Sequence, residues 1–319
     1  MLIIMIAGFS ISLILVLVLM PSFINFLKKL SFRQTVSEYA LDDDKKKAGT
    51  PIMGGILFIV IPVLVSAIAT IRSFNDLSIW IVMLAFVGYG LIGFVDDYLI
   101  AVKKNNDGLS PKQKFGLQLV LAVLFFFLYR SHADLSIALP FVSHPVNLGW
   151  GYFILVVLMF TGSSNAVNLT DGMDGLAAGV SILALLPYVV ICAVQGRSSL
   201  AVFVTSLIGG LLGYLYYNKK PAKVFMGDTG ALALGGVLAG LAMITKTELL
   251  LIVIAAVPVI ETLCVIIQQV SVRTGHGRVF PYTPIHYAFR IKGMPEKNIV
   301  RMFWAAEAVF ALIGLLIWL

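Results

Sequence analysis

The chain has 319 residues, of which 60% are apolar and 12% are charged, and its mean hydropathy is +0.98. A soluble domain carries about 25% charged residues, so this composition excludes an ordinary water-soluble protein. The formal net charge is +7, but no soluble domain or aromatic platform accompanies it, which argues against nucleic acid as a partner.

Ten apolar runs follow one another along the chain, and they predict helices that cross about 30 Å of hydrocarbon. We place these helices at about 3–27, 52–71, 79–97, 115–130, 150–166, 176–194, 200–217, 230–245, 249–271 and 299–319. The first run lacks a basic start and a small-residue cleavage site, so it is predicted to be a retained span. The sequence therefore predicts an all-α polytopic membrane protein, a single domain over 1–319, with room for a short hairpin between 131 and 150.

Positively charged residues are distributed unevenly between the two sets of loops. Nineteen of the 23 Lys and Arg residues follow the first, third, seventh and ninth predicted helices, and the opposite loops keep only Arg72, Arg130, Arg197 and Lys246. Because cytoplasmic loops carry the excess of positive charge, both termini are predicted to lie outside. Membrane lipid is an expected partner, since basic residues at a membrane surface attract anionic headgroups.

Three acidic residues stand where a helix cap is one possible explanation. Asp171 and Asp174 have the spacing of an N-cap and its N3 partner for the helix at 176–194. Asp228 could likewise cap the helix at 230–245. From the residues alone, a structural cap and a cation-binding site remain equally open for these positions.

Asp96 and Asp97 fit a structural role poorly. They are predicted to end the helix at 79–97, where the helix dipole disfavours carboxylates and where the two charges repel each other. Carboxylates gathered at one membrane face suit a divalent cation with oxygen ligands, and magnesium fits best because it keeps positions for water and phosphate. No His/Cys set has the spacing of a zinc site, and no phosphate-binding P-loop motif is present.

Five motifs occur in order, each in a predicted cytoplasmic loop. They read KAGTPIMGG at 47–55, DDY at 96–98, SNAVNLTDGMDG at 164–175, PAKVFMGDTG at 221–230 and PIH at 284–286. Together they resemble the phospho-N-acetylmuramoyl-pentapeptide transferases, a family of the polyprenyl-phosphate N-acetylhexosamine-1-phosphate transferase superfamily. The resemblance runs through nearly the whole chain.

The resemblance implies a fold, a location and a reaction. The fold would have ten transmembrane helices, with 249–271 bent or broken near the cytoplasmic side, and would form a homodimer in the cell membrane of a bacterium. The active site would lie on the cytoplasmic face. It would transfer phospho-MurNAc-pentapeptide from UDP-MurNAc-pentapeptide to undecaprenyl phosphate, forming lipid I and UMP, with Mg²⁺ required.

The resemblance also assigns roles by position. Asp228 resembles the family's magnesium ligand, Asp96 and Asp97 the acidic pair near the lipid phosphate, and His286 the first histidine of a Pro-x-His-His-His motif. The positions that resemble substrate-binding residues are Lys47, Asn168, Asp171, Asp174, Asn218, Phe225 and Gln268, with Phe225 expected to stack on the uracil. Asp96 or Asp97 is a candidate general base, although a phosphate with a second pKa near 6 makes a base helpful rather than obligatory.

Several positions depart from the family pattern. Tyr287 and Ala288 stand where the family has two more histidines. Other departures are Arg290 for a usual Glu, Ile52 for a usual Thr, and Ile100 for a common Lys. They leave open a related enzyme that uses UDP-GlcNAc or another UDP-N-acetylhexosamine to build a different surface polymer.

A secondary transporter is the alternative from another class. Transporter sites lie near the bilayer midplane, and here only Glu261 and Glu307 approach it. We expect each of these two carboxylates to make an interhelical or interfacial hydrogen bond instead. The remaining acids favour an enzyme with its site at the membrane surface.

Overall fold

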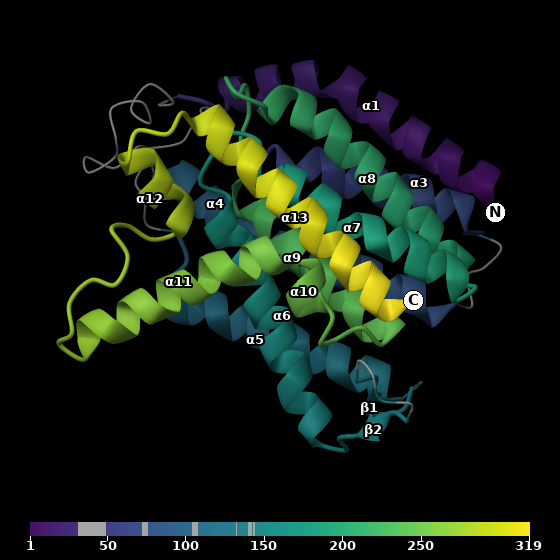
Figure 1. The fold of residues 1–319 in the computed structure, drawn as a ribbon. Helices are drawn as coiled ribbons and strands as arrows, with labels where there is room; N and C mark the ends of the chain where they lie inside the picture. Colours follow the sequence, from purple (N-terminus) through teal and green to yellow (C-terminus); the bar gives the residue numbers. More distant parts are fainter. Residues whose placement is uncertain (31–48, 72–75, 104–107, 132, 140–141, 143) are drawn as a thin grey trace.

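The computed structural model describes residues 1–30, 49–71, 76–103, 108–131, 133–139, 142 and 144–319 (Figure 1). The longer helices are α1 (Leu2–Lys29), α3 (Gly55–Ala69), α4 (Leu77–Lys103), α5 (Pro111–Arg130), α6 (Gly151–Thr170), α7 (Leu176–Val194), α8 (Ser198–Asn218), α9 (Gly227–Thr245), α11 (Ala256–Arg273) and α13 (Glu296–Trp318). The short elements are β1 (Ser136–Ile137), β2 (Val146–Asn147), α10 (Leu251–Ile254) and α12 (Ile285–Ile291).

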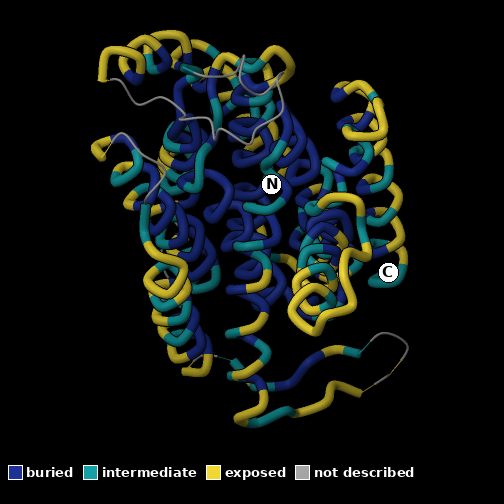
Figure 2. Tube along the Cα trace, turned by 90° about the vertical axis from the view of Figure 1, so that its left-hand side faces the viewer, coloured by how far each residue is buried: buried dark blue, intermediate teal, exposed yellow. Residues whose placement is uncertain are grey.

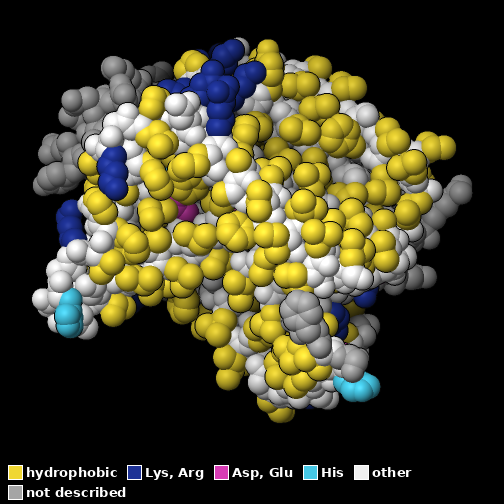
Figure 3. All heavy atoms as spheres, in the orientation of Figure 1, with side chains coloured by type: hydrophobic (Ala, Val, Ile, Leu, Met, Phe, Trp, Pro, Cys, Tyr) yellow, Lys and Arg dark blue, Asp and Glu magenta, His cyan; other side chains and the backbone are white. Residues whose placement is uncertain are grey.

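In the described ranges, nine helices are long and apolar enough to cross a membrane, and the shorter α3 is also apolar. This confirms the predicted all-α, polytopic architecture. Hydrophobic side chains cover most of the face seen in Figure 3, as expected where hydrocarbon replaces water. Both termini lie on one side of the molecule, and α12 lies on the opposite side (Figure 1).

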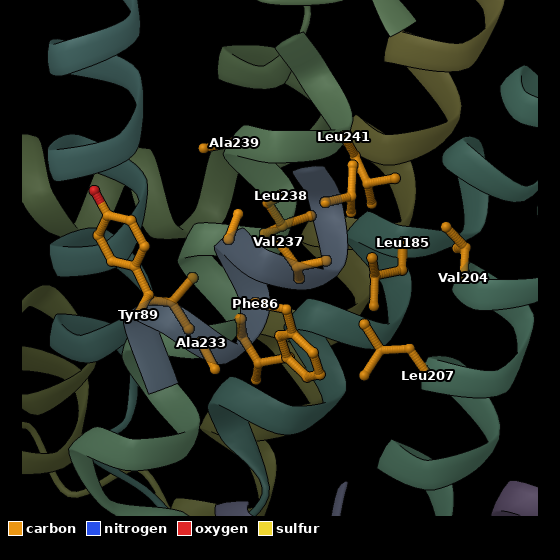
Figure 4. Packing of buried hydrophobic residues seen from close by; sticks show 14 of the residues in the cluster. Phe86, Tyr89, Leu185, Val204, Leu207, Ala233, Val237, Leu238, Ala239 and Leu241 are labelled. Atoms are coloured by element: carbon orange, nitrogen blue, oxygen red, sulfur yellow. The ribbon is translucent and has the colours of Figure 1, made fainter. Parts of the chain in front are cut away.

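Helix α9 is the centre of the bundle. In its most apolar 18-residue stretch, 89% of the residues are buried, whereas only 22% are buried in the corresponding stretch of α1. Figure 2 shows this contrast between inner and outer helices. Small residues let neighbouring backbones approach closely, as between membrane helices in general. In Figure 4, Ala233 and Val237 of α9 lie beside Phe86 and Tyr89 of α4. The core thus fixes α4 against α9, the pair that carries the acidic residues.

Several helices extend beyond their predicted ends. Helix α4 continues to Lys103, so the prediction that Asp96 and Asp97 end it is wrong. The apolar pattern continues through Val102, which explains the extension. Helix α6 likewise runs to Thr170, and α9 begins at Gly227.

The N-terminal caps that the sequence left open for these acidic residues are not formed. Helix α7 has Gly175 as its N-cap, with φ of +80°, and no side-chain cap hydrogen bond is found there among the described residues. Because α6 runs to Thr170, Asp171 is instead its C-cap. In the same described range, Met226 is the N-cap of α9 without a side-chain bond, and Asp228 lies in the first turn.

The helix predicted at 249–271 is broken at Ala255 into α10 and α11. The carboxylate of Glu307 accepts a hydrogen bond from the backbone N–H of Val257 at 2.9 Å, which satisfies a donor that lipid could not. Ile254 packs against Gly314, near the C-terminal end of α13. The predicted break in this helix is therefore present, and it lies beside the C-terminal part of α13.

The predicted hairpin is present between α5 and α6. Strands β1 and β2 pair antiparallel, with Ser136 opposite Asn147. Lys246, just after α9, donates to the carbonyl oxygens of Asp134 and Ser136 at 2.8 Å each. Its ammonium also holds the pKa of the Asp134 carboxyl below its usual range. Lys246 thus fastens the hairpin to the bundle.

Candidate functional site

Three carboxylates meet where α4 contacts the start of α9. Asp96, Asp97 and Asp228 each offer one oxygen, and these oxygens lie within 4.8 Å of one another. Asp96 and Asp97 are each only 4% exposed. Buried carboxylates so close together need positive charge or donated hydrogen bonds to remain ionised.

Asp97 receives its hydrogen bonds from the first turn of α9. Its Oδ1 accepts the N–H of Asp228 at 3.1 Å, and its Oδ2 accepts the N–H and the hydroxyl of Thr229 at 3.0 and 2.6 Å. A carboxylate at a helix N-terminus is favoured by the helix dipole and by these charge-assisted bonds. Gly227 has φ of +70°, and a Cβ there would overlap this carboxylate. Asp97 thus caps α9 from another helix and fixes the position of Asp228.

Lys114 supplies the positive charge. Ser110 and Gln113 form a capping box at the start of α5, which places Lys114 in its first turns. The Lys114 ammonium donates to Asp228 and lies 3.2 Å from Oδ2 of Asp96. The sequence interpretation counted Lys114 only as a loop cation and missed this contact. The sequence did contain an indication of it, because the helix dipole disfavours a lysine near a helix N-terminus unless an acidic partner compensates.

The donor set of the cluster suits a hard divalent cation. All three groups are carboxylates, and the Asp228 side chain remains 22% exposed on the open side. Magnesium is typically bound by one or two carboxylates, with water and phosphate completing its coordination. The Lys114 ammonium between Asp96 and Asp228 marks the same location as favourable for a cation. The residues present therefore fit a metal site of this class.

Two loops beside the cluster are joined by buried side chains. Asn218, 2% exposed, accepts the N–H of Gly175 at 3.0 Å and donates to the carbonyl of Val224 at 2.9 Å. Asp174 accepts the N–H of Ala222 at 3.0 Å. These two predicted substrate-binding residues thus connect the α6–α7 loop to the α8–α9 loop, and Asn218 uses both ends of its amide to do so.

Glu296 extends this joint to α13. Its Oε1 accepts the N–H of Asp174 at 3.0 Å, and its Oε2 pairs with Lys220. Sequence reasoning did not single out Glu296, because its partners lie more than 70 residues away in the chain. The three loops at this end of the molecule are therefore held as one unit.

Three other predicted binding residues keep exposed surface at these loops. Asn168, Asp171 and Phe225 are each partly exposed. The backbone of Phe225 bonds Pro51 and Gly54 at 2.8 Å each, which brings the start of α3 to the α8–α9 loop. The described part of the first motif therefore lies next to Phe225.

The remaining two predicted binding residues do not join this group. Lys47 lies outside the described residues. Gln268, on α11, accepts the N–H of Val279 and of Phe280 at 3.1 and 2.9 Å, and so braces the segment that follows its helix. Its carbonyl oxygen is engaged there.

His286 lies fully buried at the start of α12. Its Nδ1 is 2.9 Å from Oε1 of Glu261, whose Oε2 accepts the N–H of Ile285 at 2.7 Å. Its Nε2 faces Gly172 in the α6–α7 loop, since a Cβ at Gly172 would overlap that nitrogen. The hydroxyl of Tyr287 donates to the carbonyl of Gly172 at 3.1 Å. Thus Tyr287, a departure from the family motif, binds the same loop that His286 faces.

The contacts confirm that both midspan carboxylates make hydrogen bonds between elements. Glu261 of α11 bonds α12, and Glu307 of α13 bonds the start of α11. Neither belongs to the group of three carboxylates.

Substituting Gly172 with Ala is expected to push His286 and Tyr287 away from the loop. Overpacking of this kind costs about 1–3 kcal/mol, so we expect turnover to fall by about 5- to 150-fold. Gly162→Ala, in α6, is the matched control because a Cβ there meets nothing within 4 Å. Steady-state rates of both variants check the prediction, and equal rates would contradict the close packing at Gly172.

The comparisons with known proteins agree with this geometry. The family model for glycosyl transferase family 4 matches residues 79–246, which run from α4 to the end of α9 and include all three carboxylates. Proteins named phospho-N-acetylmuramoyl-pentapeptide-transferase, from Geobacillus sp. (strain WCH70) and Geobacillus thermodenitrificans, are 44% identical to this chain over 317 residues, 98% of each chain. The chain belongs to the phospho-N-acetylmuramoyl-pentapeptide-transferase family.

A third relative with this name, from Bacillus subtilis (strain 168), is 42% identical over 313 residues, 97% of this chain and 95% of its own. Membership of this transferase family, with relatives from bacteria and nine candidate spans in the described ranges, identifies a multi-pass protein of the bacterial plasma membrane. The recognition made from the five motifs is confirmed.

Proposed function

We propose that this chain transfers phospho-MurNAc-pentapeptide from UDP-MurNAc-pentapeptide to undecaprenyl phosphate, forming lipid I and releasing UMP for peptidoglycan biosynthesis. The observation that carries the proposal is the group of Asp96, Asp97 and Asp228 with Lys114 at the α4–α9 contact. It lies in a chain that matches transferases of this name over 98% of its length.

In the proposed reaction, an oxygen of the lipid phosphate forms a bond to the β-phosphorus of the donor. The bond from that phosphorus to the bridging oxygen breaks, and UMP leaves with the electron pair. Asp228 and Asp96 are the residues that would hold Mg²⁺, with Asp97 keeping Asp228 in place. Bound Mg²⁺ supplies positive charge that offsets the negative charge developing on the phosphate oxygens.

Lys114 has a second part in the proposal. Its ammonium pairs with both Asp96 and Asp228 in the structure described above. With a cation bound to these carboxylates, the same ammonium is close enough to bind a phosphate oxygen of the substrates. Lys114 would then position the phosphates for in-line transfer, which is the main requirement of this chemistry.

The donor's nucleotide is proposed to bind at the joined loops. Asn168, Asp171 and Phe225 offer partly exposed surface there, with Phe225 stacking on the uracil. Asp174 and Asn218 shape this wall by holding its loops together. His286 is proposed to act beside Gly172. Lys47, by its motif position, and Gln268, by its resemblance to a family position on the helix predicted at 249–271, remain proposed binding residues.

The orientation and assembly are also proposals. We infer that the end carrying these loops is cytoplasmic, because the loops there hold most of the Lys and Arg residues. Both termini and the β1–β2 hairpin would then lie outside. A homodimer is proposed on the family resemblance.

A donor-specificity assay tests the function. Purified protein would be incubated with undecaprenyl phosphate, Mg²⁺ and either UDP-MurNAc-pentapeptide or UDP-GlcNAc, with UMP release and the mass of the lipid product as readouts. We expect lipid I only with the first donor, and no product when Mg²⁺ is omitted. A lipid product from UDP-GlcNAc alone would instead support the related 1-phosphate transferase. Substrate flux in sealed vesicles without UMP release would support a transporter.

A further inference from the structure

We propose that Glu261 is a positioning residue for the transfer reaction, which sets the orientation and the protonated nitrogen of His286. This inference rests on the proposed function, in which His286 acts at the α6–α7 loop. Glu261 touches neither substrate in this assignment, and it acts only through the imidazole.

The contact between the two residues is fully enclosed. Glu261 and His286 are both 0% exposed. The two oxygens of the Glu261 carboxylate have separate partners, since Oε1 lies 2.9 Å from Nδ1 of His286 and Oε2 accepts the N–H of Ile285 at 2.7 Å. One carboxylate therefore holds both the first turn of α12 and the ring that projects from it.

This arrangement determines which ring nitrogen faces the loop. A carboxylate oxygen only accepts hydrogen bonds, so Nδ1 must carry a proton to bond it. The other nitrogen, Nε2, faces Gly172 and has no hydrogen-bond partner among the described residues. A buried ring nitrogen without a partner is unusual, and the proposal assigns it to a substrate group bound at this loop.

The chemistry of that substrate group follows from the location. Gly172 belongs to the α6–α7 loop, whose neighbours Asn168 and Asp171 are the proposed nucleotide wall. An Nε2 without a proton accepts a hydrogen bond, so a hydroxyl of the donor's sugar is the group for it to bind, whereas a diphosphate oxygen would need a proton on Nε2 as well. Orientation of a histidine by a carboxylate on its other nitrogen is a general device, in metal sites and in catalytic triads alike.

Glu307 offers a matched control within the same fold. It is also 0% exposed, and it accepts a backbone N–H, that of Val257, at the start of α11. In the described structure, none of its hydrogen bonds goes to α12. Glu307→Gln therefore measures the general effect of neutralising a buried glutamate in this bundle.

The test is a double-mutant cycle with kcat and KM measured separately. Glu261→Gln, His286→Asn and the double variant would be compared with the wild type and with Glu307→Gln. We expect Glu261→Gln to lower kcat by about 30- to 100-fold with little change in either KM, as when an interaction made only in the transition state is removed. The double variant should be at most about threefold slower than His286→Asn, because both changes remove the same function. Glu307→Gln should stay within about threefold of the wild type.

Losses of kcat that multiply in the double variant would overturn the proposal, as would a wild-type kcat in Glu261→Gln.

A measurement on the unaltered protein does not depend on how the variants fold. Nitrogen-15 spectra of labelled histidines, with the His286 signal assigned by its loss in His286→Asn, should show a protonated Nδ1. An unprotonated Nδ1 would contradict the proposal. A wild-type protein that forms no lipid product would contradict the proposed function, whereas an active one with multiplying losses contradicts only the role of Glu261.

Discussion

Replacing Asp228 with Ala is expected to lower UMP release by at least about a thousandfold, because the variant loses the carboxylate proposed to bind the cation at the reacting phosphates. Asp228 is the most exposed of the three carboxylates, with its side chain 22% exposed, so it faces the space a substrate can reach. Its removal also leaves Lys114 with Asp96 as its remaining partner in the cluster.

The rate should be measured at increasing Mg²⁺ concentrations with both substrates saturating. Direct ligation predicts that excess metal does not restore the rate, since a missing ligand is not replaced by mass action alone. Asp134→Asn is the control, because Asp134 lies at the opposite end of the molecule in the hairpin and pairs with Lys246 there. Full rescue of Asp228→Ala by metal would count against direct ligation.

Replacing Asp97 with Asn is expected to lower turnover by about 100-fold through misplacement of the first turn of α9. An amide oxygen in the position of Oδ2 could keep both bonds from Thr229, but the NH₂ group would then face the N–H of Asp228. Two donors facing each other repel, so Asp228 would shift. Each lost charge-assisted bond costs about 1.5–3 kcal/mol, which also predicts a lower unfolding temperature.

The pH dependence separates this positioning role from a general base. If Asp97 only positions Asp228, the variant's rate profile between about pH 6 and 9 keeps its shape, because the acceptor phosphate is already largely dianionic. A base role predicts that the acidic limb of the profile is lost. Unchanged turnover across this range would contradict both roles. The same profile for Asp134→Asn provides the reference.

The transmembrane architecture was predictable because it depends on a physical length. A run such as 3–27 must be apolar to cross hydrocarbon, whatever it packs against. The helix ends were less predictable, because they depend on partners distant in sequence. Asp97 and Asp228 illustrate this, since the first turn of α9 is capped by a residue 131 positions earlier. Local spacing suggested caps from within each helix instead.

The site residues were found by motif, but their physical roles were not readable from the sequence. Asn218 was expected to bind the nucleotide, yet its amide joins the backbones of Gly175 and Val224. The contact of Lys114 with the carboxylates was missed, because these partners lie on α4 and α9. Such contacts depend on how the helices pack, which the order of the motifs does not reveal.

The central claim is that Asp228 and Asp96, with Asp97 holding Asp228 in place, form a divalent-cation site, and binding of Mn²⁺ as a paramagnetic substitute for Mg²⁺ tests it most directly. Free Mn²⁺ would be quantified by electron paramagnetic resonance as it is titrated into the purified protein. Wild type and Asp134→Asn should bind a single ion per chain that Mg²⁺ displaces, and Asp228→Ala should lose this binding. Equal binding by Asp228→Ala and the wild type would contradict the assignment.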